Sequence, residues 1–206
     1  MITHNQADQI FNDMLLEVKQ YNVPDWIFNS LPIHVNNTAL IAEKIAKASH
    51  LDSEKAYVMG MLHDLGKADE TIHNRFHGIM GYERLKSLDP VIAHICLTHM
   101  FINNDSRQII DNHRLFYGNE KDQEFIISYL DSHPADDYDL LIQLSDGLSG
   151  PKGPITIENR MIEYNQRHKL NRTWEEMQDR IRLRLDIKKY FEQKTKCDIY
   201  ELLCLK

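Results

Sequence analysis

Met61-Leu62-His63-Asp64-Leu65-Gly66-Lys67 is the stretch of this sequence that most constrains its fold. It follows residues 53–60, in which small and apolar side chains recur at helical spacing in a helix capped near Asp52 or Ser53. Gly66 offers a place for that helix to stop. We therefore expect a helix whose C-terminal end presents His63 and Asp64, at a point where loops commonly open into clefts.

Helical periodicity extends from this stretch almost to both ends of the chain, whereas the alternation typical of half-buried strands is nearly absent. We therefore predict an all-α protein, a compact multi-helix bundle with additional C-terminal helices. Besides the helix that leads into His63, the expected helices begin at residue 3 and then cover residues 34–49, 78–87, 90–101, 106–112, 119–132 and 137–149.

Two capping boxes mark helix starts near the ends of the chain. Thr3 with Gln6 predicts the first helix, and Thr173 with Glu176 predicts a long late helix. The buried stripe expected on this late helix consists of Trp174, Met177, Ile181 and Leu185.

Proline and glycine divide the sequence without separating it into domains. Pro24 and Pro32 flank a short segment, and residues 147–154, with three glycines and two prolines, form the strongest helix breaker. The helices that follow lack an obvious core of their own. We therefore expect one domain over residues 1–206, with a motif-bearing core at about 30–150 and a helical extension at about 155–206.

Composition limits the class of protein. With 206 residues, 42% of them hydrophobic and 27% charged, the chain can fold around a core. No apolar run approaches the roughly 18 residues that span a bilayer, and the polar N-terminus predicts a cytoplasmic protein without a membrane partner. A net charge of −7 makes nucleic acid an unlikely partner. The odd number of cysteines predicts reduced, packed thiols.

Histidine is unusually frequent, with 11 residues, so the question is which of them converge. His34, His63, Asp64 and Asp146 supply two imidazoles and two carboxylates, a donor set that suits Mn²⁺, Fe²⁺, Co²⁺, Ni²⁺ or Zn²⁺. A structural zinc site is not indicated, because thiolates are missing from the set. Three helices packed side by side can direct these groups into one cavity.

The same residues resemble the H…HD…D signature of the HD-domain metal-dependent phosphohydrolase superfamily over roughly residues 30–150. His34 opens a helix, residues 61–67 match the central motif closely, and residues 144–148 resemble the late aspartate helix. The resemblance implies hydrolysis of a phosphate ester or anhydride in a nucleotide or another small phosphorylated metabolite. It also implies that Asp64 links the metal and the attacking water, and that Lys67 lies near that water or the substrate phosphate.

Two further histidines, His77 and His99, stand where many relatives place ligands for a second metal. The HD-GYP branch has a proline and a second histidine where this chain has Gly78 and Met100, and the Gly-Tyr-Pro signature is missing. Cleavage of cyclic dinucleotides is therefore not supported. One or two divalent ions, of Mn, Fe, Co, Ni, Zn or Mg, remain compatible with the sequence.

Other basic and imidazole side chains receive weaker interpretations. Arg75 is a secondary candidate for phosphate binding, and His94 is expected to pack or to support neighbouring groups. The mixed charges of residues 172–189 predict a solvated helix face.

Two other functions fit the same ligand set. Some HD-like proteins hold two irons and oxidise a small polyol or phosphonate with oxygen, and a pocket of this kind can also serve as a non-catalytic nucleotide sensor. Bound iron with oxygen consumption would favour the first alternative, and ligand binding without turnover would favour the second. The oligomeric state is not indicated by the sequence.

Overall fold

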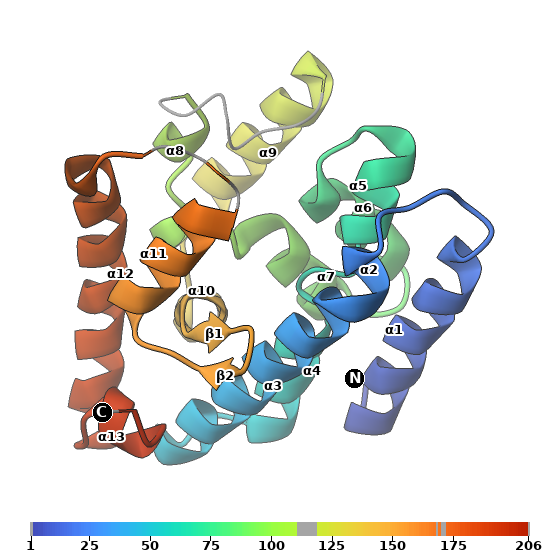
Figure 1. Ribbon diagram of the computed structural model, residues 1–206. Helices are drawn as coiled ribbons and strands as arrows, with labels where there is room; N and C mark the ends of the chain where they lie inside the picture. The colour runs from blue at the N-terminus through green and yellow to red at the C-terminus, as the bar shows by residue number, and fades with distance from the viewer. Residues whose placement is uncertain (1, 111–118, 168, 170–171, 206) are drawn as a thin grey trace.

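The computed structural model describes residues 2–110, 119–167, 169 and 172–205, and helices dominate it, which confirms the all-α prediction (Figure 1). The first seven helices are α1 (His4–Val18), α2 (Trp26–Asn29), α3 (Leu31–Ala48), α4 (Ser53–Leu62), α5 (Lys67–His73), α6 (His77–Leu85) and α7 (Pro90–Thr98). After the 3₁₀ helix η1 (Ile102–Asn104) come α8 (Arg107–Ile110), α9 (Glu120–Ser132), α10 (Asp137–Gly147), α11 (Ile157–Arg167), α12 (Trp174–Thr195) and α13 (Ile199–Leu202).

The centre of the bundle consists of α3, α4 and α10, which pack against one another. In Figure 1, α10 is seen end-on between α12 on one flank and the α3–α4 pair on the other. Helices α6 and α7 form a second pair that contacts the same centre. Segments far apart in sequence therefore meet around the C-terminal end of α10.

The main hydrophobic core continues into the C-terminal extension. It includes Phe11 of α1, Ile45 of α3 and Leu144 of α10, together with Ile187 and Phe191 of α12. A smaller cluster joins α6, α7 and α9 through buried side chains such as Phe76, Phe101 and Ile126. The C-terminal helices thus share the core of the motif-bearing part.

A short antiparallel pair holds the end of α10 against α3. Strand β1 (Ser149–Gly150) pairs with β2 (Gly153–Pro154), with Ser149 opposite Pro154. Asn37 donates a hydrogen bond to the Gly150 carbonyl at 3.0 Å, and Thr38 bonds the Ser149 hydroxyl at 2.9 Å. The sequence predicted only a loop here, because two-residue strands leave no alternation to detect.

Several predicted helix starts are confirmed, and others shift. Thr3 and Gln6 form the capping box of α1, and Asp52 caps α4. Helix α3 begins at Leu31 rather than at residue 34, because Pro32 occupies its first turn, where proline costs no hydrogen bond. Helix α5 was not predicted, since the chain resumes a helix directly after Gly66. Of the predicted helix 106–112, the structure describes α8 over Arg107–Ile110, and residues 111 and 112 lie outside the described part.

The predicted buried stripe of the late helix needs correction. Met177 and Ile181 are buried and Leu185 is partly buried, but Trp174 at the first position of α12 is 51% exposed. Trp174 precedes the part of the helix that packs on the core. The prediction from periodicity therefore placed the start of the buried stripe one turn too early. The Glu176 side chain of the predicted capping box lies outside what the structure describes.

Two further expectations have a structural outcome. The cysteines are free. Cys96 is buried and Cys204 is exposed, so the prediction of a packed thiol holds for Cys96 but not for Cys204. Among the described residues, none of the helices combines the length and the apolar composition needed to cross a bilayer.

Candidate metal centre

Six predicted ligand residues lie together, although they come from separate elements. His63 is the C-cap of α4, with Asp64 in the next turn, and His99 is the C-cap of α7. The other three stand in the first half of α3, at the first position of α6 and near the end of α10; they are His34, His77 and Asp146.

Asp64 lies between two pairs of histidines. Its Oδ2 atom is 3.7 Å from His34 Nε2 and 3.6 Å from His63 Nε2. Its Oδ1 atom is 3.3 Å from both His77 Nε2 and His99 Nε2, which are 3.4 Å from each other. One carboxylate therefore faces two separate groups of nitrogen donors.

Two overlapping groups of three side chains have donor atoms within 4.8 Å of one another, a spacing that could hold a metal ion; they are His34, His63 and Asp146, and His63, Asp64 and His99, with His63 common to both. Asp146 joins the first group through its Oδ1 atom, which is 3.2 Å from His34 Nε2. Imidazole and carboxylate donors are the set that Mn²⁺, Fe²⁺, Co²⁺, Ni²⁺ and Zn²⁺ accept.

The hydrogen bonds of the buried histidines define which nitrogen carries the proton. His63 Nδ1 lies 2.7 Å from the Gly60 carbonyl, and His99 Nδ1 lies 3.1 Å from the Ile95 carbonyl. A carbonyl oxygen can only accept, so each Nδ1 must donate. In a neutral ring, the Nε2 atom then carries a free lone pair that faces Asp64, as metal ligation requires.

This arrangement places acceptor atoms against acceptor atoms. His63 Nε2 and Asp64 Oδ1 are buried, and neither makes a hydrogen bond to any described residue. Facing lone pairs and a carboxylate at 3.3–3.6 Å repel one another unless a cation lies between them. The donors present therefore fit a divalent ion.

Protonation states agree with this fit. Burial lowers the pKa of His63 to about 4, so its ring is neutral at neutral pH. Burial alone raises the pKa of Asp64, but His63 and Lys67 outweigh it and hold that pKa well below its ordinary value. In the same way, the bond to His34 outweighs burial and lowers the pKa of Asp146. The carboxylates are therefore ionised.

Lys67, the first residue of α5, lies beside the centre. Its Nζ atom is 3.0 Å from His77 Nδ1 and 3.4 Å from Glu70 Oε2, while Glu70 Oε1 is 3.1 Å from the same His77 nitrogen. Burial lowers the pKa of Lys67, but Asp64 and Glu70 outweigh it and raise that pKa, so the ammonium stays charged. Glu70 was not predicted as a site residue, although it lies one turn after Lys67 on the same helix face.

Gly66 permits the close approach that brings His77 to Asp64. A Cβ atom at Gly66 would lie 2.1 Å from the His77 carbonyl oxygen and 2.5 Å from the Gly81 nitrogen. Both contacts are with backbone of α6, which cannot rotate away. Helix α4 already ends at Leu62, and Gly66 is the N-cap of α5 rather than the stop that the sequence predicted. This glycine therefore serves the packing of α5 against α6.

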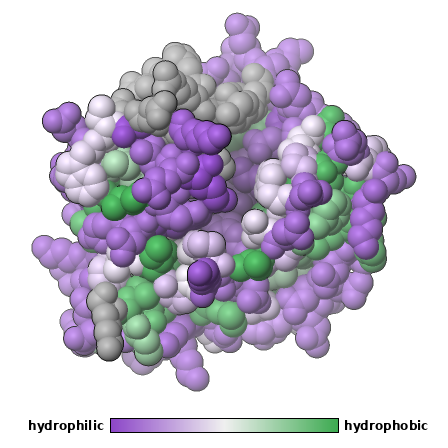
Figure 2. Space-filling model, in the orientation of Figure 1, coloured by the Kyte–Doolittle hydropathy of each residue, from purple (hydrophilic) through white to green (hydrophobic). Residues whose placement is uncertain are grey.

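A cavity of about 100 Å³ opens next to Asp146. Its lining includes Asp146, Gly147 and Tyr164, together with Arg160, Arg172, Arg180 and Arg184. In the space-filling view, the surface over α11 is mostly hydrophilic and borders a hollow near the middle of this face, whose lower part carries hydrophobic patches (Figure 2).

The arginines correct the prediction that residues 172–189 form only a solvated face. Arg182 is exposed as predicted, but Arg180 and Arg184 line the cavity. The sequence did contain a sign that Arg184 faces inward. Arg184 follows the buried Met177 by seven residues and Ile181 by three, so it lies on the same face of the helix.

Two other side chains are engaged elsewhere. Arg75 binds Asp122 at 2.8 Å and Glu83 at 3.5 Å, so its guanidinium is paired away from the centre, and the phosphate-binding interpretation is not supported. His94 lies 3.0 Å from both the Tyr129 hydroxyl and an Asp139 carboxylate oxygen, in agreement with a packing role.

A family comparison agrees with this arrangement. The HD domain family matches residues 33–150, more than half of the chain, and the chain belongs to that family. The superfamily consists mostly of metal-dependent hydrolases. No curated protein and no solved structure matches the chain. The match ends at Gly150, so the arginines of α11 and α12 lie beyond it.

Proposed function

We propose that this protein is a metal-dependent phosphohydrolase that cleaves a phosphate ester or anhydride of a nucleotide or another small phosphorylated metabolite. The observation that carries the proposal is the pair of buried atoms without hydrogen bonds, His63 Nε2 and Asp64 Oδ1, at the centre of a histidine and carboxylate cluster. An arginine-lined cavity beside the cluster supports an anionic substrate.

We assign one divalent ion to His34, His63, Asp64 and Asp146. A second ion is assigned to the other oxygen of Asp64 together with His77 and His99, because those three donor atoms lie within 3.4 Å of one another. An ion bound there supplies a Lewis acid for a phosphate oxygen and lowers the pKa of a coordinated water.

The protein side chains then have separate tasks. Lys67 keeps its charge and can donate from Nζ to a phosphate oxygen, where it offsets the negative charge that develops in the transition state. Asp64 stays ionised. With His77 Nε2 bound to the ion, Nδ1 would carry the proton and donate to Glu70, which would fix the orientation of that ring. Asp64 and Lys67 are therefore the proposed catalytic residues.

The proposal is tested by metal analysis of the purified chain and by a phosphate-release screen of nucleotides and small phosphate esters with Mn²⁺, Co²⁺, Ni²⁺, Fe²⁺ and Mg²⁺. Asp64→Ala and Asp146→Ala are expected to lose bound metal and turnover. Asp13→Ala, a change to an exposed carboxylate of α1, is the control and should retain both.

Three outcomes would contradict the proposal. Retention of metal and turnover in either site variant would remove that residue from the site. Oxygen consumption by an iron-loaded protein without phosphate release would indicate an oxygenase. Nucleotide binding without turnover in any metal would indicate a sensor.

A further inference from the structure

The cavity beside Asp146 collects positive charge in a chain whose net charge is −7. Four guanidinium groups line it, from α11, α12 and the segment between them. Two carboxylates oppose them, since Glu163 pairs with Arg160 and Asp146 belongs to the lining. Glu163 also binds Arg167 at 2.9 Å, so among the described side chains at least two positive charges of this cavity have no carboxylate that balances them.

Arg180 and Arg184 carry that excess. Neither has an ion pair with a carboxylate among the described side chains, and Arg184 Nε is buried without a hydrogen bond. Burial, together with the neighbouring Arg172 and Arg184, lowers the pKa of Arg180 to about 10. The arginines repel one another, so a bound anion would stabilise the cluster.

The cavity is connected to the metal centre through α10. Gly147 follows Asp146, and a Cβ atom there would lie 2.7 Å from both Cδ and Nε of Arg184. The absence of a side chain at Gly147 thus allows the Arg184 side chain to lie against the helix beside a proposed metal ligand. Asp146 faces His34 on one side and the cavity on the other.

The volume suits a ligand group rather than a packing defect. About 100 Å³ is several times the roughly 10–15 Å³ that one water requires. Guanidinium groups bind phosphate oxygens through two parallel hydrogen bonds, a geometry that lysine cannot offer. A phosphate group is therefore the ligand whose charge and shape fit this lining best.

We propose that this cavity binds a second phosphate group of the substrate, so that the substrate carries at least two phosphates, one at the metal centre and one among the arginines. The inference rests on the proposed phosphohydrolase function and adds the substrate class. The C-terminal extension, which lies beyond the family match, would then select substrates, while the matched part performs the chemistry.

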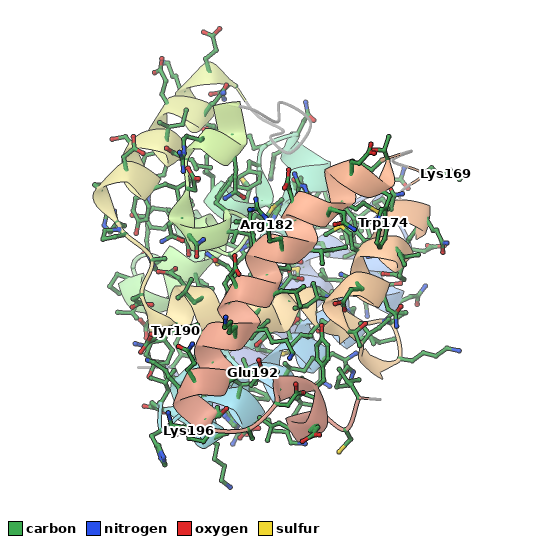
Figure 3. The ribbon with its side chains drawn as sticks, turned by 90° about the vertical axis from the view of Figure 1, so that its left-hand side faces the viewer. Lys169, Trp174, Arg182, Tyr190, Glu192 and Lys196 are labelled. Carbon is green, nitrogen blue, oxygen red and sulfur yellow. The ribbon has the colours of Figure 1, made fainter. Side chains whose placement is uncertain are left out.

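Helix α12 offers a matched pair of variants. Arg180 lines the cavity, whereas Arg182, two residues later, has a side chain that is 70% exposed. Figure 3 views the molecule from the side of α12, with Arg182 labelled on that helix. Arg180→Gln and Arg182→Gln remove the same charge from the same helix, but only the first removes it from the cavity.

The binding experiment uses the full chain freed of metal by chelation and dialysis, with inorganic pyrophosphate as the probe in calorimetry. Wild type and Arg182→Gln are expected to bind alike, and Arg180→Gln should bind at least about tenfold more weakly. Arg172→Gln, in the segment between α11 and α12, provides a second variant if Arg180→Gln does not fold. Absence of binding by wild type, or equal binding by the cavity and control variants, would overturn the proposal.

The kinetic experiment separates this inference from the proposed function. With the activating metal, kcat/KM for a nucleoside triphosphate should exceed that for the monophosphate at least about tenfold, and Arg172→Gln should reduce this ratio. Phosphate release without such a preference would contradict the cavity assignment and leave the hydrolase intact. Pyrophosphate binding without phosphate release in any metal would contradict the hydrolase instead.

Discussion

Glu70 sets the direction of His77, and so decides how well the second group of donors is arranged. Its Oε1 atom lies 3.1 Å from His77 Nδ1, and when that nitrogen carries the proton and donates to Glu70, the Nε2 lone pair faces Asp64. We expect Glu70→Gln to weaken binding of the second ion by about 10–100-fold, because an amide orients the ring less strongly. Metal titration followed by elemental analysis measures this effect.

Glu83→Gln is the control for Glu70→Gln, because Glu83 is an exposed carboxylate of α6 that contacts Arg75 instead. Two ions bound with unchanged affinity in Glu70→Gln would show that Glu70 does not position His77.

The buried imidazoles make stability depend on pH. The pKa of His63 in the folded metal-free protein is about 4, below the ordinary value of 6.5, so the unfolded chain binds more protons between these pH values. The free energy of unfolding should therefore fall as the pH falls from 7 to 5, by about 2 kcal/mol from His63 alone. Urea unfolding of the chelated protein at several pH values measures the slope, and His63→Gln should flatten it. An identical slope in both proteins would contradict the neutral, buried state of His63.

At the residue scale, the sequence predicted the ligand types better than their environment. His34, His63, Asp64 and Asp146 were recognisable because metals require particular donors, and spacing placed each on or beside a helix. Glu70 was not recognisable, because a carboxylate on a helix surface looks the same whether it faces solvent or an imidazole ring. The same ambiguity hid Arg180 and Arg184 among neighbouring charges.

At the element scale, two glycines perform different tasks that a substitution can separate. A Cβ atom at Gly66 would meet backbone atoms of α6 at 2.1 and 2.5 Å. Gly66→Ala must therefore separate α5 from α6, and we expect it to lower the free energy of unfolding by about 1–3 kcal/mol or more. Urea unfolding of the metal-free protein measures this loss.

Gly147→Ala should behave differently, because the clash is with the flexible Arg184 side chain at 2.7 Å rather than with backbone. We expect a smaller loss of stability, about 1 kcal/mol or less, together with weaker binding of pyrophosphate as Arg184 is displaced. Equal losses of stability in the two alanine variants would contradict this distinction.

The elements themselves were predictable where periodicity and caps coincide, as in α1, α4 and α10. Short elements escaped prediction for a physical reason. Helix α5 and the β1–β2 pair are too short to show a period, and packing against α6 and α3 stabilises them rather than local preference.

At the scale of the whole molecule, the core of α3, α4 and α10 continues into α12 through Ile187 and Phe191. We therefore expect unfolding in one cooperative transition, with circular dichroism and tryptophan fluorescence reporting the same midpoint. Trp26 of α2 and Trp174 of α12 report on opposite parts of the chain. Two separated transitions would indicate that the C-terminal extension folds independently.

Metal binding should stabilise this single cooperative unit, because the donors come from four helices and the turn after α4, and the unfolded chain does not hold them together. At a free metal concentration about 100 times the Kd, linkage adds about 2.7 kcal/mol. For a chain of this size, that free energy raises Tm by roughly 5–10 °C. Thermal melts with and without Mn²⁺ measure the shift, which Asp64→Asn should abolish because the central carboxylate is lost. An equal shift in wild type and Asp64→Asn would mean that Mn²⁺ stabilises the protein at some other place.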